Sequence, residues 1–144
     1  MCANENEKKK AYLRRYLDYK QKEKEILLEI EELESSYILP SKVVDDMPHG
    51  SGGERDLSVF ASQYDRLRRK LIQTLRKSTA SRTRIVKAIE SMPCGEAEKT
   101  LLRYRYILGY KWENIADAMG YEERWTLELH GRALQKFEIP KRVH

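Results

Sequence analysis

The sequence predicts an all-α protein, in which a long antiparallel helical hairpin of the coiled-coil type is followed by three short helices. Three observations support this fold class. The 144 residues include only seven Gly and four Pro, so long stretches contain no residue that interrupts a helix. Two of these stretches repeat apolar residues at alternating spacings of four and three, as in a helix with one buried seam. The C-terminal third instead shows three shorter helical periods, the first two of which are followed by glycine.

Composition excludes several classes of protein. Charged residues make up 35% of the chain and hydrophobic residues 40%, which favours a helical, solvent-rich molecule over one with a thick core. No apolar run reaches the length of a membrane span, and the polar start MCANENEKKK lacks the apolar segment of a signal peptide. We therefore expect a cytoplasmic protein without membrane partners. Cys2 and Cys94 have no metal-ligand spacing, so reduced thiols are expected.

The first helix is expected within residues 1–37, starting near Lys8 and ending near Tyr37. Its apolar seam consists of Tyr12, Tyr16, Tyr19, Ile26, Ile30, Leu33 and Tyr37, and only Glu23 interrupts it. Basic residues crowd the N-terminal end of this helix and acidic residues its C-terminal end. This arrangement opposes the helix dipole, so a partner of opposite charge is expected.

Residues 38–56, ILPSKVVDDMPHGSGGERD, contain two Pro and three Gly and predict a flexible loop. The GSGG stretch is not a phosphate-binding loop, because no Gly-Lys-Ser/Thr follows it.

The second long helix is expected at residues 57–92, with Asp56 as its cap. Its seam consists of Leu57, Phe60, Tyr64, Leu67 and Leu71. An antiparallel hairpin would place the acidic end of the first helix beside Arg66–Lys70. Hydroxylated residues thin the seam near 77–82, where a break is possible.

The three short helices are expected at 96–108, 112–119 and 122–137, within a domain at 96–138, and 139–144 form a basic tail. Gly109 and Gly120 offer the positive φ that commonly ends a helix, and Tyr121 is expected as a buried pivot. Two helices joined by a short glycine-containing turn form a helix-turn-helix. The alternative is an αα-hairpin that packs only against itself.

The stretch GYKWENIADAMGYEERWTLELHGRALQKF resembles region 4 of the sigma-70 family. It is more closely similar to the ArpU/RinA type of late transcription activators from phages of Gram-positive bacteria. LLRYRYILGYKWENIA matches the lead-in of that family, and MPHGSGGERDLSVFA resembles its linker. This chain departs from the family pattern at Lys111 and Glu122, where Ser or Thr normally caps the helix. The resemblance implies a phage or prophage DNA-binding protein that activates late genes and contacts RNA polymerase.

In a helix-turn-helix, the first residues of the second helix reach base edges in the major groove of double-stranded DNA. The residues expected to read bases are Glu123, Arg124, Trp125 and Glu128. For Glu123 the alternative is a simple helix-start preference, and for Trp125 it is anchoring a protein partner. The residues expected to contact the DNA backbone are Lys111, Arg132, Lys136, Arg82, Arg84 and Lys87.

The basic charge lies before the helix-turn-helix. Residues 64–87 carry nine basic groups against the single Asp65, whereas residues 88–144 carry no net charge. The residues at 82–87 are thus expected to supply affinity that does not depend on base sequence.

No catalytic, metal or cofactor site is predicted, because no polar groups converge in a known catalytic motif. His130 is expected to pack or meet solvent.

Two alternatives to transcription regulation remain open. One is a DNA-binding small terminase subunit of the packaging machinery, and the other is a module that binds polymerase or a sigma partner with little base readout. The hairpin is expected to form a homodimer or to extend toward the polymerase.

Overall fold

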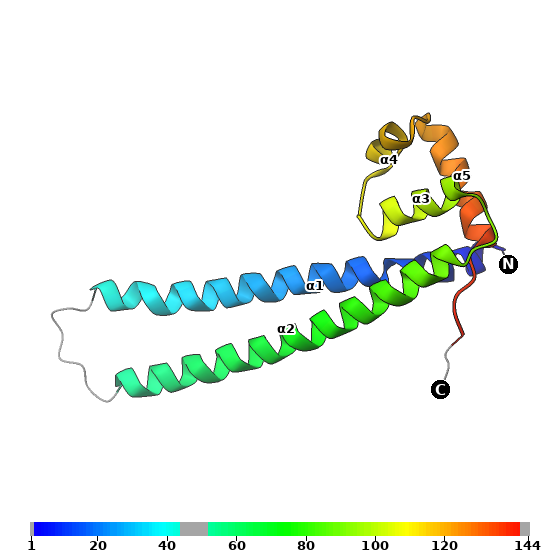
Figure 1. Ribbon diagram of the computed structural model, residues 1–144. Helices are drawn as coiled ribbons and strands as arrows, with labels where there is room; N and C mark the ends of the chain where they lie inside the picture. The colour runs from blue at the N-terminus through cyan, green and yellow to red at the C-terminus, as the bar shows by residue number, and fades with distance from the viewer. Residues whose placement is uncertain (1, 44–51, 142–144) are drawn as a thin grey trace. The chain divides into compact units, whose positions relative to one another are not determined.

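The computed structural model describes residues 2–43 and 52–141, and in these ranges the protein is all-α as predicted. Five helices follow one another (Figure 1): α1 (Cys2–Val43), α2 (Gly52–Glu90), α3 (Glu96–Tyr106), α4 (Trp112–Met119) and α5 (Glu123–Lys136). None of them, over the residues described, is both long and apolar enough to cross a membrane.

Both long helices extend further into the predicted loop than the sequence predicted, although α2 ends at Glu90 rather than at residue 92. Helix α1 passes the predicted end at Tyr37 and continues through Pro40 to Val43, while α2 begins at Gly52. Proline removes one N–H, whose acceptor would be the carbonyl of Ser36, and Ser36 is exposed to water. The remaining part of the predicted loop, residues 44–51, lies outside the described residues.

Helix α2 has no break at residues 77–82. The positions that lack large apolar side chains are nevertheless buried, because Thr74, Ser78 and Ser81 continue the seam as far as Ile85, where apolar residues resume. The Thr74 hydroxyl donates to the Lys70 carbonyl at 2.8 Å, which satisfies the buried oxygen within the helix. Small hydroxylated residues therefore thin the apolar seam without ending the helix.

The described residues divide into two compact units. Unit 1 comprises the described parts of Met1–Tyr19 and Lys77–His144, and unit 2 comprises those of Lys20–Arg76. In unit 2 the rings of Tyr37 and Phe60 pack with centroids 4.5 Å apart, so the end of α1 lies beside the start of α2. The buried residues of this unit are Glu23, Ile26, Leu67 and Thr74.

The expected charge pairing inside unit 2 does not occur between the described side chains. Arg66, Arg68, Arg69 and Lys70 are exposed, as are most of the glutamates at 25–34, and no ion pair joins the two sets. Arg69 instead pairs with Asp65 of its own helix at 2.8 Å. Charges on the outer faces of two helices are separated by the apolar seam, which explains the absence of contacts.

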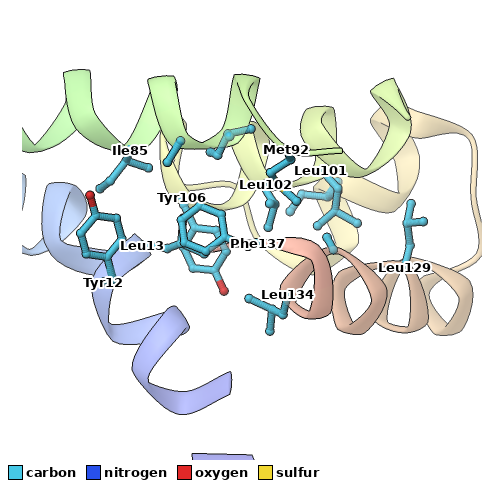
Figure 2. Close-up of a cluster of buried hydrophobic side chains, with 14 residues drawn as sticks. Tyr12, Leu13, Ile85, Met92, Leu101, Leu102, Tyr106, Leu129, Leu134 and Phe137 are labelled. Carbon is cyan, nitrogen blue, oxygen red and sulfur yellow. The ribbon is translucent and has the colours of Figure 1, made fainter. Parts of the chain in front are cut away.

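Unit 1 has one hydrophobic core, and it draws on five helices. Figure 2 shows Tyr12 and Leu13 of α1, Ile85 of α2, and side chains of α3 and α5 meeting in it. Phe137, directly after α5, is fully buried, and its ring lies 6.1 Å from that of Tyr12. The C-terminal helices therefore share their core with the first turns of α1 and the last turns of α2.

The three short helices have nearly the predicted bounds. The φ angles of Gly109 and Gly120 are 71° and 72°, which confirms the expected left-handed conformation at both positions. Tyr121, expected to be buried, is 37% exposed. Its backbone N–H bonds to the Ala116 carbonyl, so the residue closes the turn through its main chain rather than through its ring.

Candidate nucleic-acid interface

The turn between α4 and α5 has a defined geometry. Gly120 adopts the left-handed conformation and its N–H donates to the Asp117 carbonyl at 3.3 Å, while the Tyr121 N–H donates to the Ala116 carbonyl at 2.9 Å. These two bonds form a Schellman motif, which satisfies carbonyls at the end of α4 and reverses the chain. Helix α5 starts three residues later, so the turn fixes where its first residues lie.

The first half of α5 presents one buried face and one exposed face. Thr126, Leu129 and His130 are buried, and the Thr126 hydroxyl donates to the Glu122 carbonyl at 2.9 Å. The exposed face consists of Glu123, Arg124, Leu127 and Glu128. This face has the chemical groups, and the freedom, to contact a partner.

Arg124, one of the residues expected to read bases, is almost fully exposed. Its side chain is 92% exposed, and its Nε lies 3.9 Å from a carboxylate oxygen of Glu128 one turn later. An exposed pair at this distance is weak, contributing about 0.3–0.5 kcal/mol, so it can open when a partner competes. Both side chains can therefore turn toward a ligand.

Trp125 is placed differently from Arg124. It is half-buried and packs against the core of unit 1, with the Arg132 guanidinium 4.9 Å from its ring centroid. The indole of Trp125 is therefore a structural side chain at the edge of the face, and the cation beside it is Arg132.

Lys136 already has a partner. Its Nζ lies 3.1 Å from a carboxylate oxygen of Glu98, while the other oxygen of Glu98 is buried without a partner among the described residues. Burial raises the pKa of the nearby Cys94 thiol, and the neighbouring Glu98 carboxylate raises it further. Lys136 thus neutralises a partly buried carboxylate and is a poor candidate for binding phosphate.

Arg82, Arg84 and Lys87 are all exposed on α2. Burial raises the pKa of Tyr12, and the charges of Arg15 and Arg84 oppose this shift, so both arginines lie close to that ring. The guanidinium of Arg15 is 5.1 Å from the Tyr12 centroid. Arg15 of α1 and Arg84 of α2 therefore both lie near Tyr12.

Lys111 is exposed and directly precedes α4, and Glu122 has the same position before α5. Neither side chain forms a capping hydrogen bond. The first N–H groups of both helices are thus left to water or to a ligand.

His130 is buried and neutral. Its Nε2 lies 2.8 Å from the Tyr106 hydroxyl. The rings of Trp112 and His130 are in a T-shaped arrangement, with centroids 4.6 Å apart. Burial, with the charges of Lys10, Arg105 and Arg14, lowers the pKa of His130 to about 4. No group of three or more His, Cys, Asp or Glu residues in the described ranges is arranged to hold a metal ion.

The surface around the turn is acidic. Residues 111–128 carry two basic side chains, Lys111 and Arg124, against five carboxylates. The structure thus brings together Glu123, Arg124 and Glu128 on the exposed face of α5, within a segment of net negative charge. Further cations near α4 and α5 lie on α1, α2 and α3, and Arg105 of α3 is one that sequence reasoning missed. Arg105 belongs to the helix that precedes the helix-turn-helix, where the motif indicates no DNA contact.

Comparisons of this chain with family models, with curated proteins and with solved structures find no match.

Proposed function

We propose that this protein is a DNA-binding transcription regulator, in which α4 and α5 form a helix-turn-helix and α5 reads bases. The observation that carries the proposal is the exposed face of α5 directly after the Gly120 turn. In a helix-turn-helix this part of the second helix enters the major groove. The turn geometry and the burial of Thr126, Leu129 and His130 direct Arg124 and Glu128 outward.

The exposed side chains suit base edges. Arg124 can donate two hydrogen bonds to O6 and N7 of guanine, and Glu128 or Glu123 can accept one from N4 of cytosine. A bidentate contact such as that of Arg124 with guanine contributes about 1–3 kcal/mol of discrimination against the wrong base.

The long helices serve assembly in this proposal. The contact between Tyr37 and Phe60 in unit 2 supports an antiparallel hairpin of the coiled-coil type. The hairpin would form a homodimer or extend toward RNA polymerase. The resemblance to sigma-70 region 4 and to ArpU/RinA proteins supports late-gene activation by a phage protein in the cytoplasm of its bacterial host.

The experiment that tests the proposal is selection of bound duplexes from a random pool. It compares the wild type with an Arg124→Ala, Glu128→Ala variant, and with an Arg68→Ala, Lys24→Ala control whose changes lie in unit 2. Trp125 stays unchanged, because it packs against the core. A sequence motif that only the first variant loses supports base reading by α5. A motif that the variant retains, or no enrichment by the wild type, contradicts it.

One observation favours a second function. The acidic surface at residues 111–128 would repel phosphates and suits a basic protein surface, as expected for a module that binds polymerase or a sigma partner. If the protein binds a duplex, the dependence of its affinity on salt concentration distinguishes the two functions. For DNA binding, the logarithm of the binding constant falls steeply and linearly with log[salt], because counterions are released. A wild-type protein that binds no duplex at low salt but retains purified polymerase or sigma factor supports the second function.

A further inference from the structure

The first turns of α1 lie against the three-helix segment α3–α5. The Lys9 ammonium donates to the carbonyl of Leu134 in α5 at 2.8 Å. The Leu17 side chain lies about van der Waals distance from Gly109, since a Cβ at that glycine would be 3.5 Å from Leu17 Cδ2. Two contacts thus hold α1 beside the end of α5 and beside the turn between α3 and α4.

These contacts decide which way two basic side chains of α1 are directed. Lys10, Arg14 and Leu17 are spaced four and three apart, so they share one face of the helix. Leu17 contacts Gly109, three residues before α4 begins. Lys10 and Arg14 therefore continue along the side of α1 that borders the α3–α4 turn.

Helix α3 supplies a third cation to the same place. The Arg105 guanidinium lies 4.4 Å from the ring centroid of Trp112, the first residue of α4, and donates to the Tyr110 carbonyl at 3.1 Å. The Trp112 ring in turn meets the edge of His130. Arg105 is thus held on a rigid aromatic support, with hydrogen-bond donors remaining on its guanidinium.

All three cations lie close enough to His130 to lower its pKa. Lys10, Arg105 and Arg14 each disfavour the charged form of this buried imidazole, after the larger effect of burial itself. Among the described side chains, the one carboxylate paired with these cations is Glu7, 3.4 Å from Lys10. Arg14 is exposed and forms no ion pair in the described ranges. Concentrated positive charge with so little compensation favours an anion.

We infer that Lys10, Arg14 and Arg105 form a binding site for the phosphate backbone of double-stranded DNA beside the start of α4. The site lies next to the exposed Lys111 and makes α1 part of the nucleic-acid interface. It offsets the acidic surface at residues 111–128, which would otherwise oppose the approach of α5 to DNA. This inference rests on the proposed function, because it assigns the source of its backbone affinity.

The test measures how salt changes the affinity of the full chain for one duplex chosen by the selection experiment, using fluorescence anisotropy. A Lys10→Gln, Arg14→Gln variant removes two cations. A Lys24→Gln, Arg68→Gln variant removes two exposed cations of unit 2 as the matched control. Thermal unfolding by circular dichroism checks that each variant keeps its fold, and an Arg14→Lys variant keeps the charge at the proposed site.

The slope of log K against log[salt] should fall in magnitude by about 0.9 for each lost phosphate contact, thus by roughly 1.8 for the Lys10, Arg14 variant. The loss of affinity should be equal for the selected duplex and for an unrelated one. The control and Arg14→Lys should keep the wild-type slope. Equal slopes in the wild type and the Lys10, Arg14 variant would overturn this inference and leave the proposed function intact. An equal loss in the control would overturn it as well. A wild type that binds no duplex contradicts both.

Discussion

The hydroxyl of Tyr106 and Nε2 of His130 lie 2.8 Å apart in the interior of unit 1 and join α3 to α5. Both groups are buried, so each would be left without a partner if the other were removed. Burial also raises the pKa of Tyr106 and lowers that of His130, which keeps both side chains neutral. The pair therefore fixes the position of α5 relative to α3 by a polar contact that water does not weaken.

This pair predicts that stability depends on pH through His130. Its pKa is about 4 in the folded chain and 6.5 in the unfolded chain, so between these values the unfolded chain binds a proton that the folded chain does not. The free energy of unfolding should be unaffected above pH 6.5 and should fall as pH drops toward 4. The difference amounts to about 3 kcal/mol if the whole shift is realised.

Urea unfolding of the wild type and of His130→Leu, at several pH values from 4 to 7.5, measures this contribution. The leucine variant removes the titrating group and keeps an apolar side chain. The two proteins should differ in pH dependence, with the wild type losing more stability in acid. Parallel curves over this range would show that His130 does not titrate in this way.

Two glycines provide a matched comparison of backbone conformation. A Cβ at Gly120 or at Gly131 would meet no atom within 4 Å, but only Gly120 has a positive φ, 72°. Gly120→Ala should therefore cost about 1–2 kcal/mol through strain alone. Gly131→Ala should raise the free energy of unfolding by about 0.5–1 kcal/mol, because alanine is the better helix former. Thermal unfolding of both variants checks this, and equal effects of the same sign would refute the assignment of the turn.

Glu23 is expected to destabilise unit 2. Its side chain is 6% exposed, one carboxylate oxygen lies 2.8 Å from Lys20, and the other has no partner among the described residues. A buried acceptor without a hydrogen-bond partner costs about 1–3 kcal/mol, and more if it is charged. Glu23→Leu should raise the midpoint of thermal unfolding. The exposed Glu25→Leu is the control and should change stability little; a lower midpoint for Glu23→Leu would mean that the carboxylate stabilises the fold.

Trp125 and Arg124 should separate structural from binding effects. Trp125→Ala removes a half-buried ring from the core and should cost roughly 1–3 kcal/mol of stability. Arg124→Ala removes a side chain that is 92% exposed and should change stability by less than about 0.5 kcal/mol. Urea unfolding of both variants tests the assignment. Equal stability of the two would indicate that Trp125 is not packed as described.

Local pattern predicted the short helices well. Gly109 and Gly120 predict the turns, because few other residues adopt a positive φ. The apolar spacing of Trp112, Ile115 and Ala116 predicts the bounds of α4. These features depend on residues a few positions apart. The charged and exposed character of Arg124 and Glu128 follows from the same pattern.

The contacts between distant segments could not be predicted in this way. Leu13 lies outside the seam of the first helix, yet it is fully buried, because α1 contacts α3–α5 as well as α2. A reading of one seam assumes one partner helix and leaves such a residue out. Arg105 and His130 likewise acquire their surroundings from α1, about a hundred residues earlier in the sequence.

The bond between Lys9 and the carbonyl of Leu134 has a consequence for the order in which the chain folds during synthesis. The ribosome releases Tyr12 and Leu13 long before it makes Phe137, the residue that completes their surroundings. Until then the apolar side chains at the start of α1 lack the part of their surroundings that α5 and Phe137 provide. Closing so long a loop also slows folding. The apolar side chains at the start of α1 would therefore be available to chaperones that recognise exposed apolar segments until α5 and Phe137 have been synthesised.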